Sequence, residues 1–124
     1  MPTRRQRQVS SLIHRELSLL LLLDARDPRL AGVTITEVDV TRDLLSARVH
    51  FTVLGDGDEG QEAQAALDHA ASYLRTQLAG RVELRFVPEL IFRLDKSAQY
   101  ARRIEELLDR VKDDDDSGED LGTD

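Results

Sequence analysis

The stretch from Ala63 to Asp95 constrains the fold of this chain more than any other. Its first part repeats apolar residues at helical spacing, which predicts an amphipathic helix over residues 61–79 that Gly80 ends. Its second part alternates apolar and polar residues, which predicts one long strand over residues 82–94. Two more strands and another helix are predicted before this pair, so the chain should form a small α+β sandwich.

The segments before and after this stretch have equally regular patterns. Apolar spacing predicts a helix over residues 4–24, whose broad leucine stripe should be nearly enclosed in its last turns. Residues 33–40 and 45–53 should form an antiparallel hairpin, with a bulge near Thr36 where the alternation changes phase. Pro88 should place the third strand at a sheet edge or bulge it. Ser97 is the expected N-cap of a last helix, whose inward-facing residues should be Tyr100, Ile104, Leu107, Leu108 and Val111.

Charge is distributed unevenly along the 124 residues. The net charge is −7, but residues 113–124 contain seven acids and no Lys or Arg, which leaves residues 1–112 neutral. We therefore predict one folded domain over residues 1–112 and a disordered acidic tail over residues 113–124. The tail either keeps the protein soluble or folds back onto the arginines and competes with a nucleic-acid partner.

Composition and spacing exclude several classes of function. Without cysteine there is no disulfide or thiolate metal site. The longest apolar run, residues 19–23, is too short to cross a membrane, so we expect a cytoplasmic protein. The histidines have no ligand spacing, and no nucleophile motif or phosphate loop is present. We expect no catalytic residue, metal or cofactor, and three Phe without Trp give little material for stacking on bases.

Several strings have the order and spacing of one known family. They are DPRL at 27–30, VTITEVDVTRDL at 33–44, YLR at 73–75, VPEL at 87–90 and RIEELL at 103–108. Together, over roughly residues 4–110, they resemble ribosome-binding factor A, a bacterial small-subunit maturation factor. No single string is decisive, and their joint order carries the resemblance.

The resemblance implies a KH-like fold of type II, with the order α-β-β-α-kink-α-β and an extra C-terminal helix. The family's kink would fall at Ala70, Ala71 and Ser72, where Ser72 replaces the usual glycine. It further implies a monomeric, non-enzymatic factor that binds the free 30S subunit and assists late maturation of the 5′ region of 16S rRNA. A role in cold adaptation would follow from the same resemblance.

Arginine makes up most of the basic residues and suits bidentate contacts with phosphate. The candidate RNA-binding residues are Arg75, Arg81, Arg85, Arg4, Arg5 and Arg7. Arg81 and Arg85 should lie on the polar face of the third strand. Each of the six could equally be an ordinary solvated arginine. The alternative function is a protein–protein interaction module that uses the leucine-rich first helix.

Overall fold

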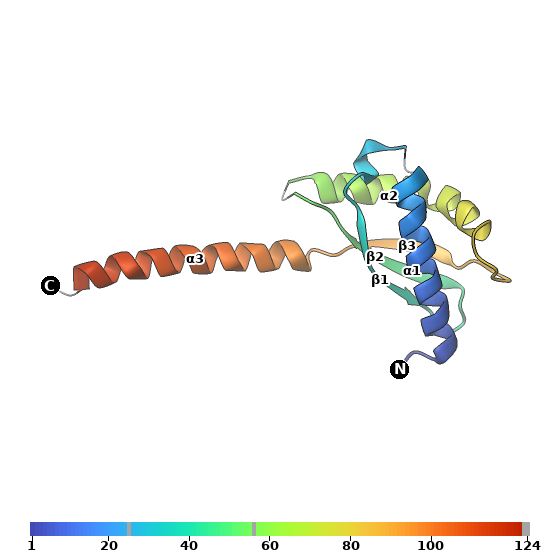
Figure 1. The fold of residues 1–124 in the computed structure, drawn as a ribbon, viewed down its shortest axis with the longest axis horizontal. Helices are drawn as coiled ribbons and strands as arrows, with labels where there is room; N and C mark the ends of the chain where they lie inside the picture. Colours follow the sequence, from blue (N-terminus) through green and yellow to red (C-terminus); the bar gives the residue numbers. More distant parts are fainter. Residues whose placement is uncertain (25, 56, 123–124) are drawn as a thin grey trace.

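The computed structural model describes residues 1–24, 26–55 and 57–122. A three-stranded sheet is covered on one face by two helices, and a third helix projects away from this domain (Figure 1). The elements are α1 (Arg4–Asp24), the 3-10 helix η1 (Pro28–Leu30), β1 (Thr34–Val40), β2 (Ser46–Thr52), α2 (Glu59–Ala79), β3 (Glu89–Leu94) and α3 (Ser97–Gly122).

The sheet has the order β1-β2-β3. β1 and β2 form the predicted antiparallel hairpin, and their register shifts between Ile35 and Glu37, which confirms the bulge. β3 pairs with β2 in parallel, because α2 carries the chain back across the sheet between them. The predicted KH-like α+β order is confirmed, and β3 lies at an edge of the sheet as Pro88 indicated.

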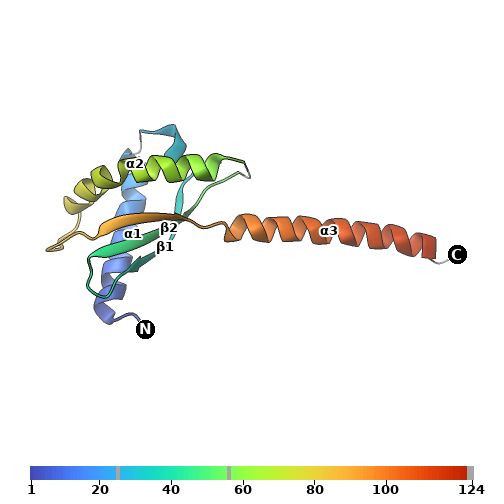
Figure 2. The same ribbon diagram turned by 180° about the vertical axis from the view of Figure 1, so that it is seen from behind.

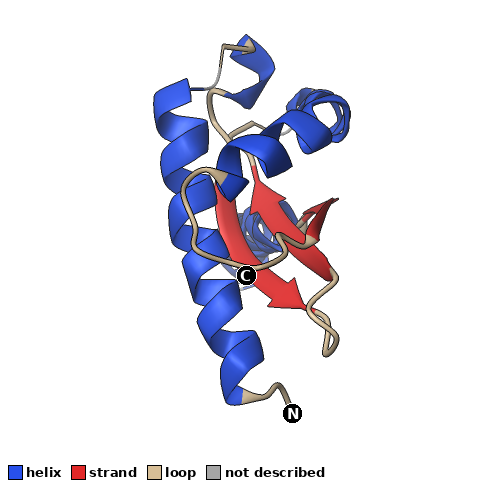
Figure 3. Ribbon diagram, turned by 90° about the vertical axis from the view of Figure 1, so that its right-hand side faces the viewer, coloured by secondary structure: helices blue, strands red, loops and turns tan. Residues whose placement is uncertain are grey.

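The core lies between the sheet and the pair α1 and α2, which cover the same face (Figure 3). Its most enclosed side chains are Ile13, Leu17, Val49, Phe51, Leu67 and Leu78. The predicted bounds of α1 are confirmed, but its last turns are not enclosed, since Leu22 and Leu23 are 79% and 70% exposed. Figure 3 shows the reason, because the end of α1 extends past the strands.

The prediction of one long strand over residues 82–94 is wrong. Only Glu89–Leu94 is strand, and residues 80–88 form a loop, which we call loop 80–88. The backbone stays coiled after α2, because the N–H groups of Arg81 and Val82 both donate to the carbonyl of Leu78. Pro88 has no N–H to give to a ladder, so the strand begins one residue later. Without strand pairing the alternation of burial also breaks, since Val82 is buried but Phe86, two steps further in the same phase, is exposed, and its neighbour Val87 is buried instead.

α2 is one hydrogen-bonded helix over its whole length, without a break at the expected kink. Its axis nevertheless turns before its C-terminal end (Figure 2). In this second half the hydroxyl of Thr76 donates to the carbonyl of Ser72 at 3.0 Å, a bond that is often associated with bending. The kink at residues 70–72 stays a prediction.

α3 differs most from its prediction. Its capping group is Asp95 and not Ser97, since Asp95 Oδ1 accepts the N–H of Ser97 at 2.8 Å. The five residues expected to face inward are exposed, because α3 points away from the sheet (Figures 1 and 2). The helix also continues past residue 112 to Gly122, so the proposed domain boundary does not coincide with a helix end. The disorder of residues 113–124 stays a prediction.

Candidate functional site

The rotation of α1 is fixed by hydrogen bonds from one flank of the helix to β1. Gln6 Nε2 donates to the carbonyl of Val40 at 3.0 Å, and Ser10 Oγ accepts the N–H of Val40 at 3.3 Å. His14 Nε2 lies 3.0 Å from the carbonyl oxygen of Ile35. Successive helical residues are rotated by about 100° around the axis. Because this flank is held against β1, the arginines of α1 face solvent or loop 80–88.

Three arginines lie along the outer face of α1. Arg4, Arg7 and Arg15 are spaced so that they follow one helical face. Together with Gln8, Ser11 and Leu12 they line a shallow groove of about 550 Å³. Arg15 also pairs with the neighbouring Glu16, its Nε lying 3.3 Å from Oε1.

A second depression, of about 230 Å³, lies between the start of α1, the β1–β2 turn and loop 80–88. Its lining residues are Arg5, Val9, Asp43, Leu44, Leu45, Leu84, Arg85 and Phe86. The structure thus brings together Arg5 and Arg85, two predicted binding residues that are far apart in the sequence. The expectation that Arg81 and Arg85 lie on a strand face is wrong, because both belong to loop 80–88.

The six predicted arginines fall into two groups. Within residues 1–24, 26–55 and 57–122, Arg4, Arg5, Arg7 and Arg85 have no hydrogen bond or ion pair through their side chains. Arg81 Nη1 instead lies 3.5 Å from Glu16 Oε2.

Arg75, like Arg81, has a partner within the protein, because its Nε and Nη2 donate to the carbonyl of Val87 at 3.0 and 2.8 Å.

We call Arg4, Arg5, Arg7, Arg15, Arg81 and Arg85 the arginine surface. Such a surface can contact phosphates. The acids beside it are Glu16, which pairs with Arg15 and Arg81, and Asp43, which lines the depression with Arg5 and Arg85.

A pair of acids lies at the other end of the sheet. The first turn of α2 carries Glu59 and Glu62, and α3 leaves the domain from the same end, where β2 and β3 finish. Figure 1 shows α3 on the opposite side of the domain from the N-terminus and loop 80–88. The acids at the start of α2 therefore lie at the other end of the domain from the arginine surface, which favours one orientation of the domain on a polyanion.

The DPRL string forms a local structure with its own electrostatics. Asp27 caps η1 by accepting the N–H of Arg29 at 2.9 Å, and it also accepts the guanidinium of Arg29 at 2.7–3.1 Å. These hydrogen bonds lower the pKa of Asp27 to about 2. The motif therefore orders the connection between α1 and β1, and nothing in it requires a ligand.

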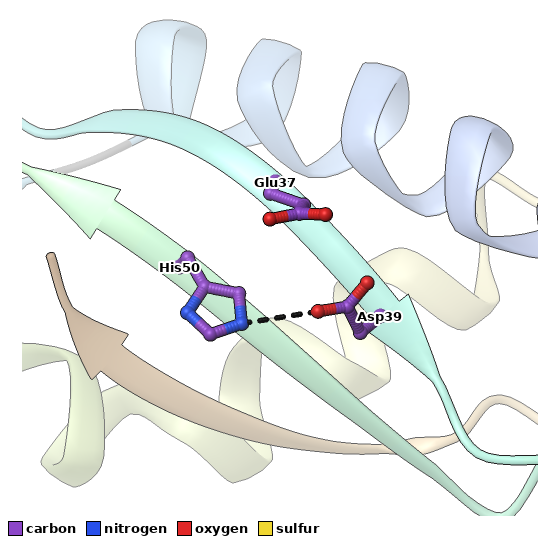
Figure 4. Close-up of side chains that lie close together, drawn as sticks. All are labelled: Glu37, Asp39 and His50. Carbon is purple, nitrogen blue, oxygen red and sulfur yellow. Dashed lines mark hydrogen bonds and ion pairs between the residues drawn. The ribbon is translucent and has the colours of Figure 1, made fainter.

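The structure assembles one group that spacing in the sequence did not reveal, on the open face of the sheet (Figure 4). Single ligand atoms of Glu37, Asp39 and His50 all lie within 4.8 Å of one another, and His50 Nε2 is 3.2 Å from Asp39 Oδ2. The bulge turns Glu37 to this face opposite His50, so the register of the hairpin was the signal that could have found it.

These side-chain types can ligate a divalent cation. However, Arg48 and Arg93 are the register partners of Asp39 and His50, and they add positive charge to the same face. The group is therefore best described as a cross-strand contact between His50 and Asp39 with a second carboxylate beside it.

The element order, the helices packed on one face of the sheet and the arginine surface define a small KH-like α+β domain. The sequence profile of ribosome-binding factor A matches residues 5–108. The ribosome-binding factor A of Halothermothrix orenii is 35% identical over 122 residues, which cover 98% of this chain and 100% of that protein. The chain belongs to the ribosome-binding factor A family.

Solved structures agree with this assignment. The solution structure of a putative ribosome-binding factor A from Thermotoga maritima is 32% identical, with a TM-score of 0.65 over 78% of this chain and 92% of that one. A homology model of the Thermus thermophilus ribosome-binding factor A, as fitted into the cryo-EM map of a 30S complex, is 26% identical. It has a TM-score of 0.59 over 70% of this chain and 91% of that one.

Proposed function

We propose that this protein binds the free small ribosomal subunit and assists late maturation of 16S rRNA, including its 5′ region, without catalysing a reaction. Membership of the ribosome-binding factor A family and the 30S complex of the Thermus thermophilus relative support this proposal. The observation in this chain that carries it is the grouping at one end of the domain of Arg4, Arg5, Arg7 and Arg85, whose side chains have no partner in the part of the chain that the structure describes. Arginines that make no internal bond can contact phosphates without first losing a partner.

The alternative, a protein-interaction module based on the leucines of α1, has less support. Leu17, Leu20 and Leu21 are buried in the domain's own core, which leaves mainly Leu22 and Leu23 for a partner. Two exposed leucines at a helix end form a small patch, and single exposed apolar residues are normal on protein surfaces.

Sedimentation of cell lysate tests the proposal. Tagged protein should migrate with free small subunits and be absent from translating ribosomes, and its depletion should leave 16S rRNA with an unprocessed 5′ end. A variant with Arg4, Arg7 and Arg85 changed to Gln should lose co-migration. The matched control changes Arg48 and Arg93 on the open face of the sheet, together with Arg110 of α3. Retained migration of the first variant, or equal loss in the control, would contradict the proposal.

A further inference from the structure

Phe86 stands apart from the other two phenylalanines of the chain. Phe51 and Phe92 are buried in the core, whereas Phe86 is 69% exposed. Its ring lines the depression of about 230 Å³ beside the β1–β2 turn. A large aromatic side chain that contributes little to the core, and instead lines a concave surface, is available to bind something.

The backbone that carries Phe86 is held in place from both sides. Leu84 is half-buried against the core, and Val87 and Pro88 are buried directly after the ring. The two hydrogen bonds from Arg75 to the carbonyl of Val87 tie the same segment to α2. The exposed ring is therefore presented on an anchored loop, so little order has to be gained when a ligand binds.

The opposite wall of the depression is also built in an unusual way. Leu44 has a φ of 64°, a left-handed conformation that costs about 1–2 kcal/mol for a residue with a Cβ. The turn is held by Asp43, whose Oδ1 accepts the hydroxyl of Thr41 at 2.7 Å and the N–H of Leu45 at 3.0 Å. Leu45 is left 59% exposed across from the ring. Strained residues of this kind are often found at binding sites.

The charges around the ring indicate the class of ligand. Arg5 and Arg85 line the same depression, and neither has a side-chain partner among the described residues. The one acid of the lining, Asp43, is engaged in holding the turn. A flat apolar ring that shares its depression with two guanidinium groups complements a ligand that has a flat face and negative charge beside it.

We propose that Phe86, Arg5 and Arg85 bind one unpaired nucleotide of RNA. The base stacks on the Phe86 ring, and the two guanidinium groups contact the phosphates on either side of it. This inference rests on the proposed function, and it adds that the protein recognises a single-stranded position as well as the phosphate backbone. It also revises the expectation from composition that the chain lacks material for stacking.

Three substitutions of Phe86 test the inference, with purified immature small subunits as the probe. Phe86→Ala and Phe86→Leu should each weaken binding by about 5- to 100-fold, because leucine fills space but cannot stack. Phe86→Trp should bind as the wild type does. The salt dependence of binding should be the same in all three, because no charge changes.

Each contrary result has a distinct meaning. Wild-type affinity of Phe86→Ala would overturn the inference and leave the proposed function intact. Wild-type affinity of Phe86→Leu would overturn it in favour of an apolar contact with a protein. If the wild type itself failed to bind small subunits, this result would contradict both the proposed function and this inference.

Fluorescence supplies a second measurement, because the chain contains no tryptophan. The single indole of Phe86→Trp should be quenched when small subunits are added. Leu54→Trp is the control, since Leu54 is 80% exposed and follows the opposite end of β2. Equal responses at both positions would contradict a stacked base at Phe86.

Discussion

The guanidinium of Arg75 is bound to the backbone carbonyl of Val87, with Nε at 3.0 Å and Nη2 at 2.8 Å. This contact joins α2 to loop 80–88, which carries Arg81, Arg85 and Phe86. Arg75, the first of the predicted RNA-binding residues, therefore has a structural role in positioning Arg81 and Arg85.

Arg75→Gln should lower the free energy of unfolding by about 1–3 kcal/mol, since a charged donor and a partly buried carbonyl both lose their partner. Arg81→Gln is the control and should cost at most about 1 kcal/mol, because its ion pair with Glu16 lies at the surface. Urea denaturation measures both. An Arg75 variant of unchanged stability but reduced salt dependence of RNA binding would identify Arg75 as a phosphate contact instead.

Gln64 protects the free edge of β3. Its Nε2 donates to the carbonyl of Phe92 at 2.8 Å, and its Oε1 accepts the N–H of Leu94 at 3.0 Å, the two groups a further strand would use. Gln64→Leu should lower stability by about 1–3 kcal/mol and promote self-association through the open edge. Denaturation and light scattering measure these effects, with exposed Gln61→Leu as the control. A monomeric Gln64→Leu variant of full stability would show that the edge needs no such cover.

The bulge and the hairpin were predictable because alternation in a strand reports directly which side chains face the core. Loop 80–88 was not, because Val82 and Leu84 keep the alternation of a strand while their backbone pairs with nothing in the sheet. The alternation also misreports burial there, because Phe86 is exposed and the off-phase Val87 is buried.

The same limit applies to α3 and to the binding surface. The apolar period of α3 predicts a buried face whether or not a partner element is present. Arg5 and Arg85 line the same depression only because of tertiary packing, so no spacing in the sequence could predict that they lie close together.

Asp27 should give the stability of the domain a specific pH dependence. Its pKa is lowered from 3.8 to about 2 by hydrogen bonds from Arg29, so folding is favoured by the charged form. The contribution is complete above about pH 5 and is lost progressively as the pH falls from the unfolded-state value of 3.8 to about 2. The difference in stability between wild type and Asp27→Asn should therefore be constant from pH 8 to 5 and shrink below pH 4. A difference that stays constant to pH 2 would contradict this assignment.

Ser72→Gly tests where α2 bends. Ser72 is exposed, so the change should cost only about 0.5 kcal/mol through helix propensity and leave the fold intact. Amide chemical shifts should change mainly around residues 70–76. The control is Ser97→Gly at the start of α3. Unfolding of the Ser72 variant would show that the kink is placed wrongly.

The salt dependence of binding to purified small subunits tests the central claim most directly, namely that the arginine surface contacts ribosomal RNA. Plots of log affinity against log salt concentration should be compared for three proteins. They are the wild type, the triple variant Arg4→Gln/Arg7→Gln/Arg85→Gln and the double variant Arg48→Gln/Arg93→Gln. The first variant should lose about one unit of slope for each phosphate contact removed, whereas the second should keep the wild-type slope. Equal slopes for wild type and the first variant would contradict the claim.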